Sequence, residues 1–103
     1  MRATLDDVLC FVREMSDVAH ARGYMLAVYG STIMKESGRD VDVFAIPWRH
    51  PVHYHDLLTA LAGRGYVELS ERYFGFQGTC SVVLCKSNTR PAIDLQIREV
   101  GER

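Results

Sequence analysis

The sequence predicts a single two-layer α+β (α/β two-layer) domain over residues 1–103, with helices mainly on one face of a β-sheet and the element order α-β-α-β-α-β-β-β. Three observations predict this class. The length gives room for one compact domain. Apolar residues make up 48% of the chain, which is enough for an ordinary core. The last third contains only strand-like runs, so helices are few and we expect part of one sheet face to be open.

The first element is a helix that we expect from about Leu5 to Arg22. Thr4 is a suitable N-cap, and Asp7 follows it three positions later, as in a capping box. Gly23 supplies the glycine that commonly ends a helix. Apolar residues recur between these signals at helical spacing, at Leu5, Val8, Leu9, Val12, Met15 and Ala19.

Two short apolar runs follow and predict buried strands. The first spans Tyr24–Tyr29 and ends at Gly30. Ser31 is a suitable cap for a short helical turn that reaches Glu36. The second strand is expected over Asp40–Ile46.

A second long helix is expected after Pro51, which suits the first turn of a helix. Gly63 and Gly65 end it. Its apolar stripe is formed by Tyr54, Leu57, Leu58 and Leu61.

The last third contains three strand-like runs, Val67–Phe74, Thr79–Lys86 and Ala92–Arg98. The turns that separate them, at 75–78 and 87–90, are short. Short turns predict that these strands are antiparallel neighbours.

Charge and hydropathy exclude some classes of function. The formal net charge of −1 argues against a protein that binds nucleic acid mainly through positive charge. No apolar run is long enough to cross a bilayer. The first residues, Met1–Thr4, lack the apolar core of a signal peptide. We therefore expect a cytoplasmic protein with no membrane contact.

Neither the cysteines nor the histidines predict a zinc site. Three cysteines without metal-ligand spacing are expected to be reduced thiols, at Cys10, Cys80 and Cys85. Three closely spaced histidines match no common zinc pattern and are expected on the surface, at His50, His53 and His55.

A pair of carboxylates opens the second strand. Asp40 and Asp42 stand at i and i+2, so both would point to the same face of a strand. Two strand rises place them roughly 6–7 Å apart, where an effective dielectric near 20 gives on the order of 2–3 kcal/mol of repulsion. A fold does not need this arrangement for stability, and a divalent cation shared by both groups would relieve it. A solvated strand start is the alternative.

Asp94 adds a third carboxylate, between two apolar residues of the final strand-like run. Such a carboxylate is costly unless it is solvated, paired or bound to metal, and pairing with Arg90 or Arg98 is the structural alternative. If the last strand pairs beside Asp40 and Asp42, three carboxylates converge. Hard oxygen ligands of this kind favour Mg²⁺ or Mn²⁺. Two such ions held about 3.5–4 Å apart can clamp the attacking and leaving oxygens of a phosphoryl displacement.

Gly30 and Ser31 predict the other half of a phosphate site. They follow a strand and precede a helical turn, where exposed N–H groups and a hydroxyl bind phosphate oxygens. Lys35, about one turn later, offers a point charge to the same phosphates or is a solvated helix residue. Arg39 either binds phosphate or neutralises the neighbouring Asp40.

This layout resembles the nucleotidyltransferase superfamily that includes DNA polymerase β, and the small size resembles its minimal nucleotidyltransferase branch. The resemblance covers roughly residues 24–97, and its specific motifs are Gly30-Ser31, Asp40 with Asp42, and Asp94. It implies a mixed β-sheet with flanking helices. It also implies transfer of a nucleoside monophosphate from an NTP, with ATP expected, to a hydroxyl-bearing acceptor, with release of pyrophosphate.

The resemblance also implies roles for the motif residues. Gly30 and Ser31 would hold the triphosphate. Asp40 and Asp42 would ligate both metals, and Asp94 would ligate the catalytic metal and help to deprotonate the acceptor.

The chain departs from the family pattern at two places. The segment between the Gly-Ser turn and Asp40 is a little shorter than usual. Thr32-Ile33-Met34 stands where Ala-Arg-Gly often follows the Gly-Ser turn. The chain offers no added recognition domain, so we expect the strand hairpins, a partner subunit or another protein to select the acceptor.

Three hypotheses follow from these residues. The first is an active Mg²⁺-dependent nucleotidyltransferase whose acceptor is a protein, a nucleic acid or a small molecule. The second is a binding or regulatory module of the same fold, such as an antitoxin-like partner protein. The third is a purely structural domain, in which the three aspartates lie apart. The sequence leaves open whether the chain forms a homo-oligomer.

Overall fold

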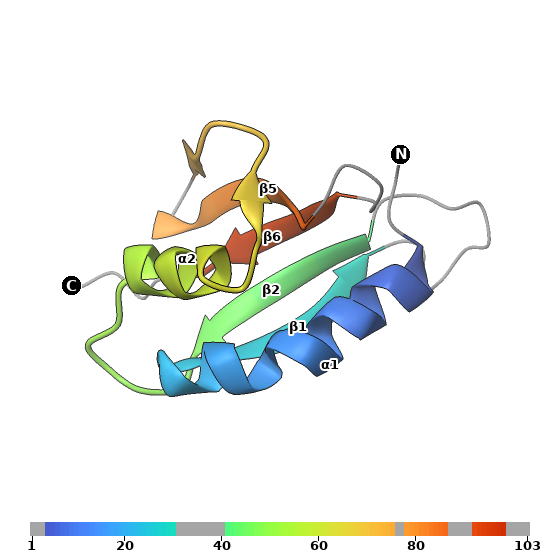
Figure 1. Ribbon diagram of the computed structural model, residues 1–103. Coiled ribbons are helices and arrows are strands. Elements are labelled where there is room, and N and C mark those ends of the chain that lie inside the picture. The colour runs from blue at the N-terminus through green and yellow to red at the C-terminus, as the bar shows by residue number, and fades with distance from the viewer. Residues whose placement is uncertain (1–3, 31–40, 76–77, 87–91, 99–103) are drawn as a thin grey trace.

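A computed structural model describes residues 4–30, 41–75, 78–86 and 92–98, and these residues form two helices and a six-stranded mixed sheet (Figure 1). The predicted α+β class is therefore confirmed. In chain order, the elements are α1 (Leu5–Ala21), β1 (Tyr24–Gly30), β2 (Val41–Pro47), α2 (Tyr54–Ala62), β3 (Val67–Glu68), β4 (Tyr73–Phe74), β5 (Cys80–Cys85) and β6 (Ile93–Ile97).

The sheet has the order β1-β2-β6-β5, and both β3 and β4 pair with the free side of β5. β2 and β6 are parallel, whereas the other pairs are antiparallel. The predicted antiparallel pairing among the last strands is confirmed for β4 with β5 and for β5 with β6. The parallel pair joins segments that are about fifty residues apart in sequence, and Figure 1 shows these two strands side by side.

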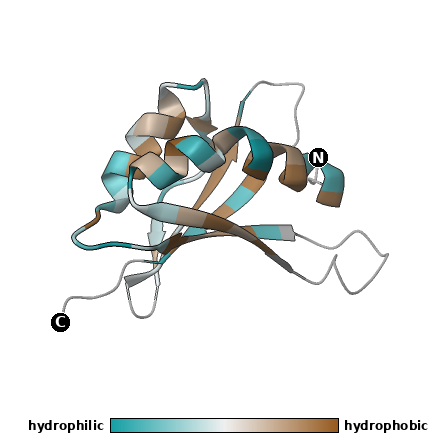
Figure 2. Cartoon of the chain, turned by 90° about the horizontal axis from the view of Figure 1, so that it is seen from below, coloured by the Kyte–Doolittle hydropathy of each residue, from teal (hydrophilic) through white to brown (hydrophobic). Residues whose placement is uncertain are grey.

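Both helices lie on the same side of the sheet, as Figure 2 shows. The strands alternate accordingly between a covered face, on which the two helices pack, and a face that neither described helix covers, called the uncovered face below. Val43 and Ala45 of β2 and Leu95 and Ile97 of β6 are 0% exposed beneath the helices. Helix residues complete this core, mainly Val8, Phe11, Met15, Ala19, Leu57, Leu58 and Leu61. The expectation that one sheet face is covered and part of the other is open is thus met.

Local signals fix both ends of α1. The Thr4 hydroxyl accepts the Asp7 N–H at 3.2 Å, and the Asp7 carboxylate accepts the Thr4 N–H at 2.9 Å, which forms the predicted capping box. The helix ends one residue earlier than predicted, with Arg22 as its C-cap. Gly23 then adopts φ +92°, and a Cβ there would lie 2.5 Å from Val52 Cγ1. A glycine is therefore required both for the backbone conformation and for space.

The end of α1 is also held by the residues that follow β2. The Trp48 ring stacks on His20 with centroids 4.6 Å apart, and its Nε1 donates to the His20 carbonyl at 3.3 Å. Arg49 donates to the Ala21 carbonyl at 3.2 Å. These bonds satisfy carbonyls that a helix C-terminus leaves without internal partners.

The start of the second helix differs from the prediction. α2 begins at Tyr54, with His53 as its N-cap, so Pro51 lies before the helix and not in its first turn. The reason is Val52, which packs against the core beside Gly23. The chain between β2 and α2 is thus used for packing before the helix starts.

The predicted strand Val67–Phe74 is interrupted. Residues 69–72 lie opposite only Val82 and Val83 of β5, so this side carries two extra residues between β3 and β4. The bulge is closed by Leu69 N–H, which donates to the Val83 carbonyl at 2.7 Å, and by the Ser70 hydroxyl, which accepts the Val83 N–H at 3.1 Å.

An ion pair spans this bulge. Arg72 Nε and Nη2 donate to the two carboxylate oxygens of Glu68, each at 2.9 Å. This bidentate hydrogen bond lowers the pKa of Glu68 below its ordinary value of 4.5 and raises the pKa of Arg72. Both side chains remain about 30% exposed, at 30% and 29%, so the pair contributes little to stability.

Candidate metal and nucleotide site

Two of the predicted carboxylates meet across the parallel strand pair. Asp42 of β2 and Asp94 of β6 are register partners. Their neighbours Val43 and Leu95 are also register partners and point into the core. Because successive side chains of a strand point to opposite faces, Asp42 and Asp94 lie together on the uncovered face. Both are half-buried.

The pairing of Asp42 with Asp94 brings two negative charges onto neighbouring strands, where a cation would relieve their repulsion. Neighbouring strands lie about 4.8 Å apart. Two charges about 5 Å apart repel by about 3 kcal/mol at an effective dielectric of 20. Carboxylate oxygens are the hard ligands that Mg²⁺ or Mn²⁺ takes. The donor set therefore fits the predicted metal.

The predicted phosphate turn would begin at the same end of the sheet. Gly30 is the last residue of β1 and is the register partner of Val41, the residue before Asp42. The remaining predicted site residues lie outside the described residues, namely Ser31, Lys35, Arg39 and Asp40. The short helical turn expected after Gly30 lies outside them as well. The structure thus joins Asp42 to Asp94, and it leaves Asp40 and most of the phosphate turn as predictions.

The part of the chain that the structure describes contains no group of three or more His, Cys, Asp or Glu side chains placed to hold a metal. The predicted third carboxylate, Asp40, is not in that part. His50, His53 and His55 are exposed, as expected for surface residues.

Sequence reasoning missed the row of side chains next to the aspartates. Two residues further along the same strands, Phe44 and Gln96 are register partners, and Ser81 of β5 is the partner of Gln96 on its other side. The Ser81 hydroxyl donates to Gln96 Oε1. The alternation of β6 places Gln96 on the uncovered face, but the contact with Ser81 depends on the pairing of β5 with β6.

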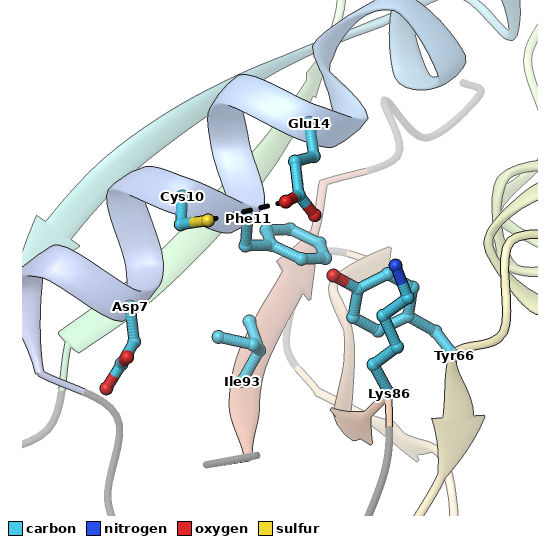
Figure 3. Close-up of a pocket in the computed structure, with 7 residues that line it drawn as sticks. All are labelled: Asp7, Cys10, Phe11, Glu14, Tyr66, Lys86 and Ile93. Atoms are coloured by element: carbon cyan, nitrogen blue, oxygen red, sulfur yellow. Dashed lines mark hydrogen bonds between the residues drawn. The ribbon is translucent and has the colours of Figure 1, made fainter.

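A separate small hollow lies on the helix side of the sheet (Figure 3). Its volume is about 60 Å³, which suits a few water molecules and not a nucleotide. Phe11 and Tyr66 form its apolar wall, with ring centroids 5.2 Å apart. Glu14 accepts a hydrogen bond from the Cys10 thiol at 3.4 Å. This hollow is on the opposite side of the sheet from Asp42 and Asp94.

Comparison with protein-family models, with curated proteins and with solved structures finds no match for this chain. Neither helix of the described residues combines the length and apolar character of a membrane span.

Proposed function

We propose that the chain is a metal-dependent nucleotidyltransferase that moves a nucleoside monophosphate from an NTP, with ATP expected, to a hydroxyl of an acceptor. One observation carries the proposal: Asp42 and Asp94, from segments far apart in sequence, are register partners on the uncovered face of the sheet. The third hypothesis, a purely structural domain with its aspartates apart, does not agree with this register for these two residues.

The proposed roles follow from the positions of the residues. Gly30 and Ser31 bind the triphosphate at the end of β1. Asp42 and Asp94, together with Asp40, hold Mg²⁺ or Mn²⁺, which supplies neutralisation of phosphate charge when bound. The acceptor oxygen bonds to the α-phosphorus while the bond from that phosphorus to the bridging oxygen breaks. Pyrophosphate leaves, and the hydroxyl proton passes to the Asp94 carboxylate.

A binding or regulatory module remains the second candidate, and one observation favours it. The segment that carries β3 and β4 exposes four large apolar side chains by more than half: Val67 at 60%, Leu69 at 59%, Tyr73 at 69% and Phe74 at 54%. Exposed apolar side chains gathered on one segment are typical of a protein-binding surface.

Calorimetry with Mg²⁺ and a non-hydrolysable ATP analogue tests the proposal. We expect the wild-type chain to bind both, and we expect Asp42→Asn and Asp94→Asn to lose metal-dependent binding. Turnover of labelled ATP should fall about 1000-fold in either variant, because a lost metal ligand removes several kcal/mol of transition-state stabilisation.

The matched control is Asp56→Asn, which removes an exposed carboxylate from α2 and should bind like the wild type. A wild-type chain that binds neither Mg²⁺ nor the analogue would contradict the proposal. A stable complex with a protein partner that is unaffected by Asp42→Asn, without transfer of label, would favour the binding module.

A further inference from the structure

The two outer edges of the sheet differ in how they are protected. β3 and β4 form one edge as two-residue strands, and the bulge between them uses the Ser70 hydroxyl in place of a backbone acceptor. β1 forms the other edge as seven continuous residues without Lys, Arg, Asp, Glu or Pro. Charges, prolines, bulges and short strands are the features that keep a sheet edge from pairing with another chain. β1 has none of these features.

The backbone of β1 presents a regular row of hydrogen-bonding groups at its edge. Trp48 N–H donates to the Gly23 carbonyl at 2.8 Å, so these two residues form a hydrogen-bonded pair that continues the β1–β2 ladder. Because such pairs alternate in an antiparallel ladder, the N–H and C=O groups of Leu26 and Val28 point away from β2. Among the described residues, no strand lies on that side of β1. These backbone groups are therefore placed to pair with an added strand.

One flank of α1 continues this edge as an apolar surface. The flank that carries Cys10 faces Tyr66 and Lys86 across the hollow in Figure 3. Helical periodicity places another set of side chains on the opposite flank, above the edge of β1. This set is apolar and only partly covered, and it consists of Leu5, Leu9 and Val12. Leu9 is 40% exposed. We call this flank, together with Leu26 and Val28, the β1 edge.

The charge distribution favours a second copy of the chain as the occupant of the β1 edge. In a symmetric contact each surface meets itself, so a charged surface would meet like charge. The residues of the β1 edge carry no charge. The charged residues that border it on α1, Asp6 and Arg13, are exposed and of opposite sign. A second copy also supplies a strand and a helix flank in the one arrangement that covers both parts of the edge.

We propose that two copies of the chain associate through antiparallel pairing of their β1 strands, which joins the two sheets into one. Full overlap of the seven residues places Ala27 opposite Ala27 of the second copy, and Leu26 opposite Val28 of the second copy. Leu26 and Val28 then exchange the hydrogen bonds. Ala27 forms the non-hydrogen-bonded pair, in which the Cα atoms approach to about 4.5 Å and a small side chain fits.

The same two-fold axis arranges the helices. Both α1 helices lie on one face of the joined sheet and run antiparallel, with their apolar flanks toward each other. Leu5, Leu9 and Val12 thereby become covered. The interface uses none of the aspartates, so it goes beyond the proposed function and does not depend on it.

Sedimentation equilibrium tests the interface. We expect the wild type to have twice the 11.7 kDa mass of one chain and to dissociate on dilution. Ala27→Lys adds a charge on the uncovered face, outside the core, and brings two like charges together at the two-fold axis. Charges about 6 Å apart at an effective dielectric of about 20 should raise the dissociation constant of the dimer about 100-fold. The matched control is Val67→Lys, which changes an exposed residue of the opposite edge and should leave the dissociation constant unchanged.

Ala27→Glu separates a lost contact from lost folding. Alone, it should dissociate as Ala27→Lys does. An equimolar mixture of the two variants should form the dimer again, because opposite charges then meet at the axis.

A disulfide tests the register of the two strands. With Cys10→Ser as background and Cys80 and Cys85 buried, Ala27→Cys should form a covalent dimer on oxidation, since paired Cα atoms about 4.5 Å apart are within disulfide reach. Met25→Cys should not, because the two copies of residue 25 would lie about 13 Å apart along the strands. A non-reducing gel measures both.

Other outcomes would overturn the inference. A wild type that sediments as a single chain at every concentration has no such interface, even if it binds a different protein. A dimer that dissociates in Val67→Lys and not in Ala27→Lys is formed at the opposite edge. A covalent dimer of Met25→Cys, without one of Ala27→Cys, shows that the strands do not pair about Ala27.

Discussion

The two faces of the sheet use the same strands for different purposes. On the helix-covered face, Val43 and Leu95 are completely buried, whereas Asp42 and Asp94 lie half-buried on the other face. Side chains one residue apart thus serve stability on one side and candidate chemistry on the other. A slip of one residue in the β2–β6 register would exchange the two sets, so the core fixes the position of the aspartates.

The largest effect on stability is expected when a buried side chain of the covered face is shortened. Leu95→Ala removes a side chain that is 0% exposed, and we expect the free energy of unfolding to fall by about 3 kcal/mol. Asp94→Asn, one residue away on the other face, removes no apolar side chain from the core and should lower it by less. Urea unfolding followed by circular dichroism measures both. Equal losses in the two variants would show that the faces do not differ as described.

The effect of Mg²⁺ on the free energy of unfolding should distinguish the two faces further. Mg²⁺ at about 100 times its dissociation constant should raise the free energy of unfolding of the wild type by about 2.7 kcal/mol. Asp42→Asn should lose this gain, because it removes one of the two carboxylates that would hold the cation. Thermal unfolding with and without Mg²⁺ measures this, with Leu58→Val as a core control that keeps the gain. If Mg²⁺ still raises the free energy of unfolding of Asp42→Asn, the cation binds elsewhere.

The smallest effect on stability is expected at the edge of the sheet, where Glu68 and Arg72 form an ion pair. The pKa of Glu68 is lowered by its hydrogen bonds to Arg72, so the pair stabilises the fold above pH 4.5. That contribution, less than about 1 kcal/mol for so exposed a pair, is lost as the pH falls from 4.5 through the lowered pKa. Urea unfolding of the wild type and Glu68→Gln at pH 7 and at successively lower pH checks it: the difference at pH 7 should shrink as the pH falls below 4.5. A difference that does not change with pH would contradict this assignment.

The sequence was sufficient where the signal is local. The capping box of Thr4 and Asp7 and the alternation around Asp94 are visible in residue types and spacing alone. The pairing of Asp94 with Asp42 is not, because no periodicity indicates which distant strand is the neighbour; only the family resemblance suggested it.

The sequence was insufficient where side chains replace regular backbone pairing. Val67–Phe74 alternates like one strand, but the Ser70 hydroxyl takes the place of a ladder acceptor and two extra residues bulge out. A hydropathy pattern does not show where a side-chain hydroxyl replaces a backbone hydrogen-bond acceptor. Val52 likewise packs on the core before α2 begins, which residue preferences at Pro51 do not indicate. The Ser81–Gln96 contact required the β5–β6 register, which is a property of the folded sheet.

Trp48, the one tryptophan of the chain, is stacked on His20 at the end of α1. It lies six positions from Asp42 along the chain, or about 20 Å at the rise of a strand. Its fluorescence should therefore change when α1 separates from β2 during unfolding, and it should stay constant while ligands fill the acidic end. Trp48 fluorescence can thus report whether the protein is folded during a ligand titration, and ligand binding at the acidic end should not change this signal.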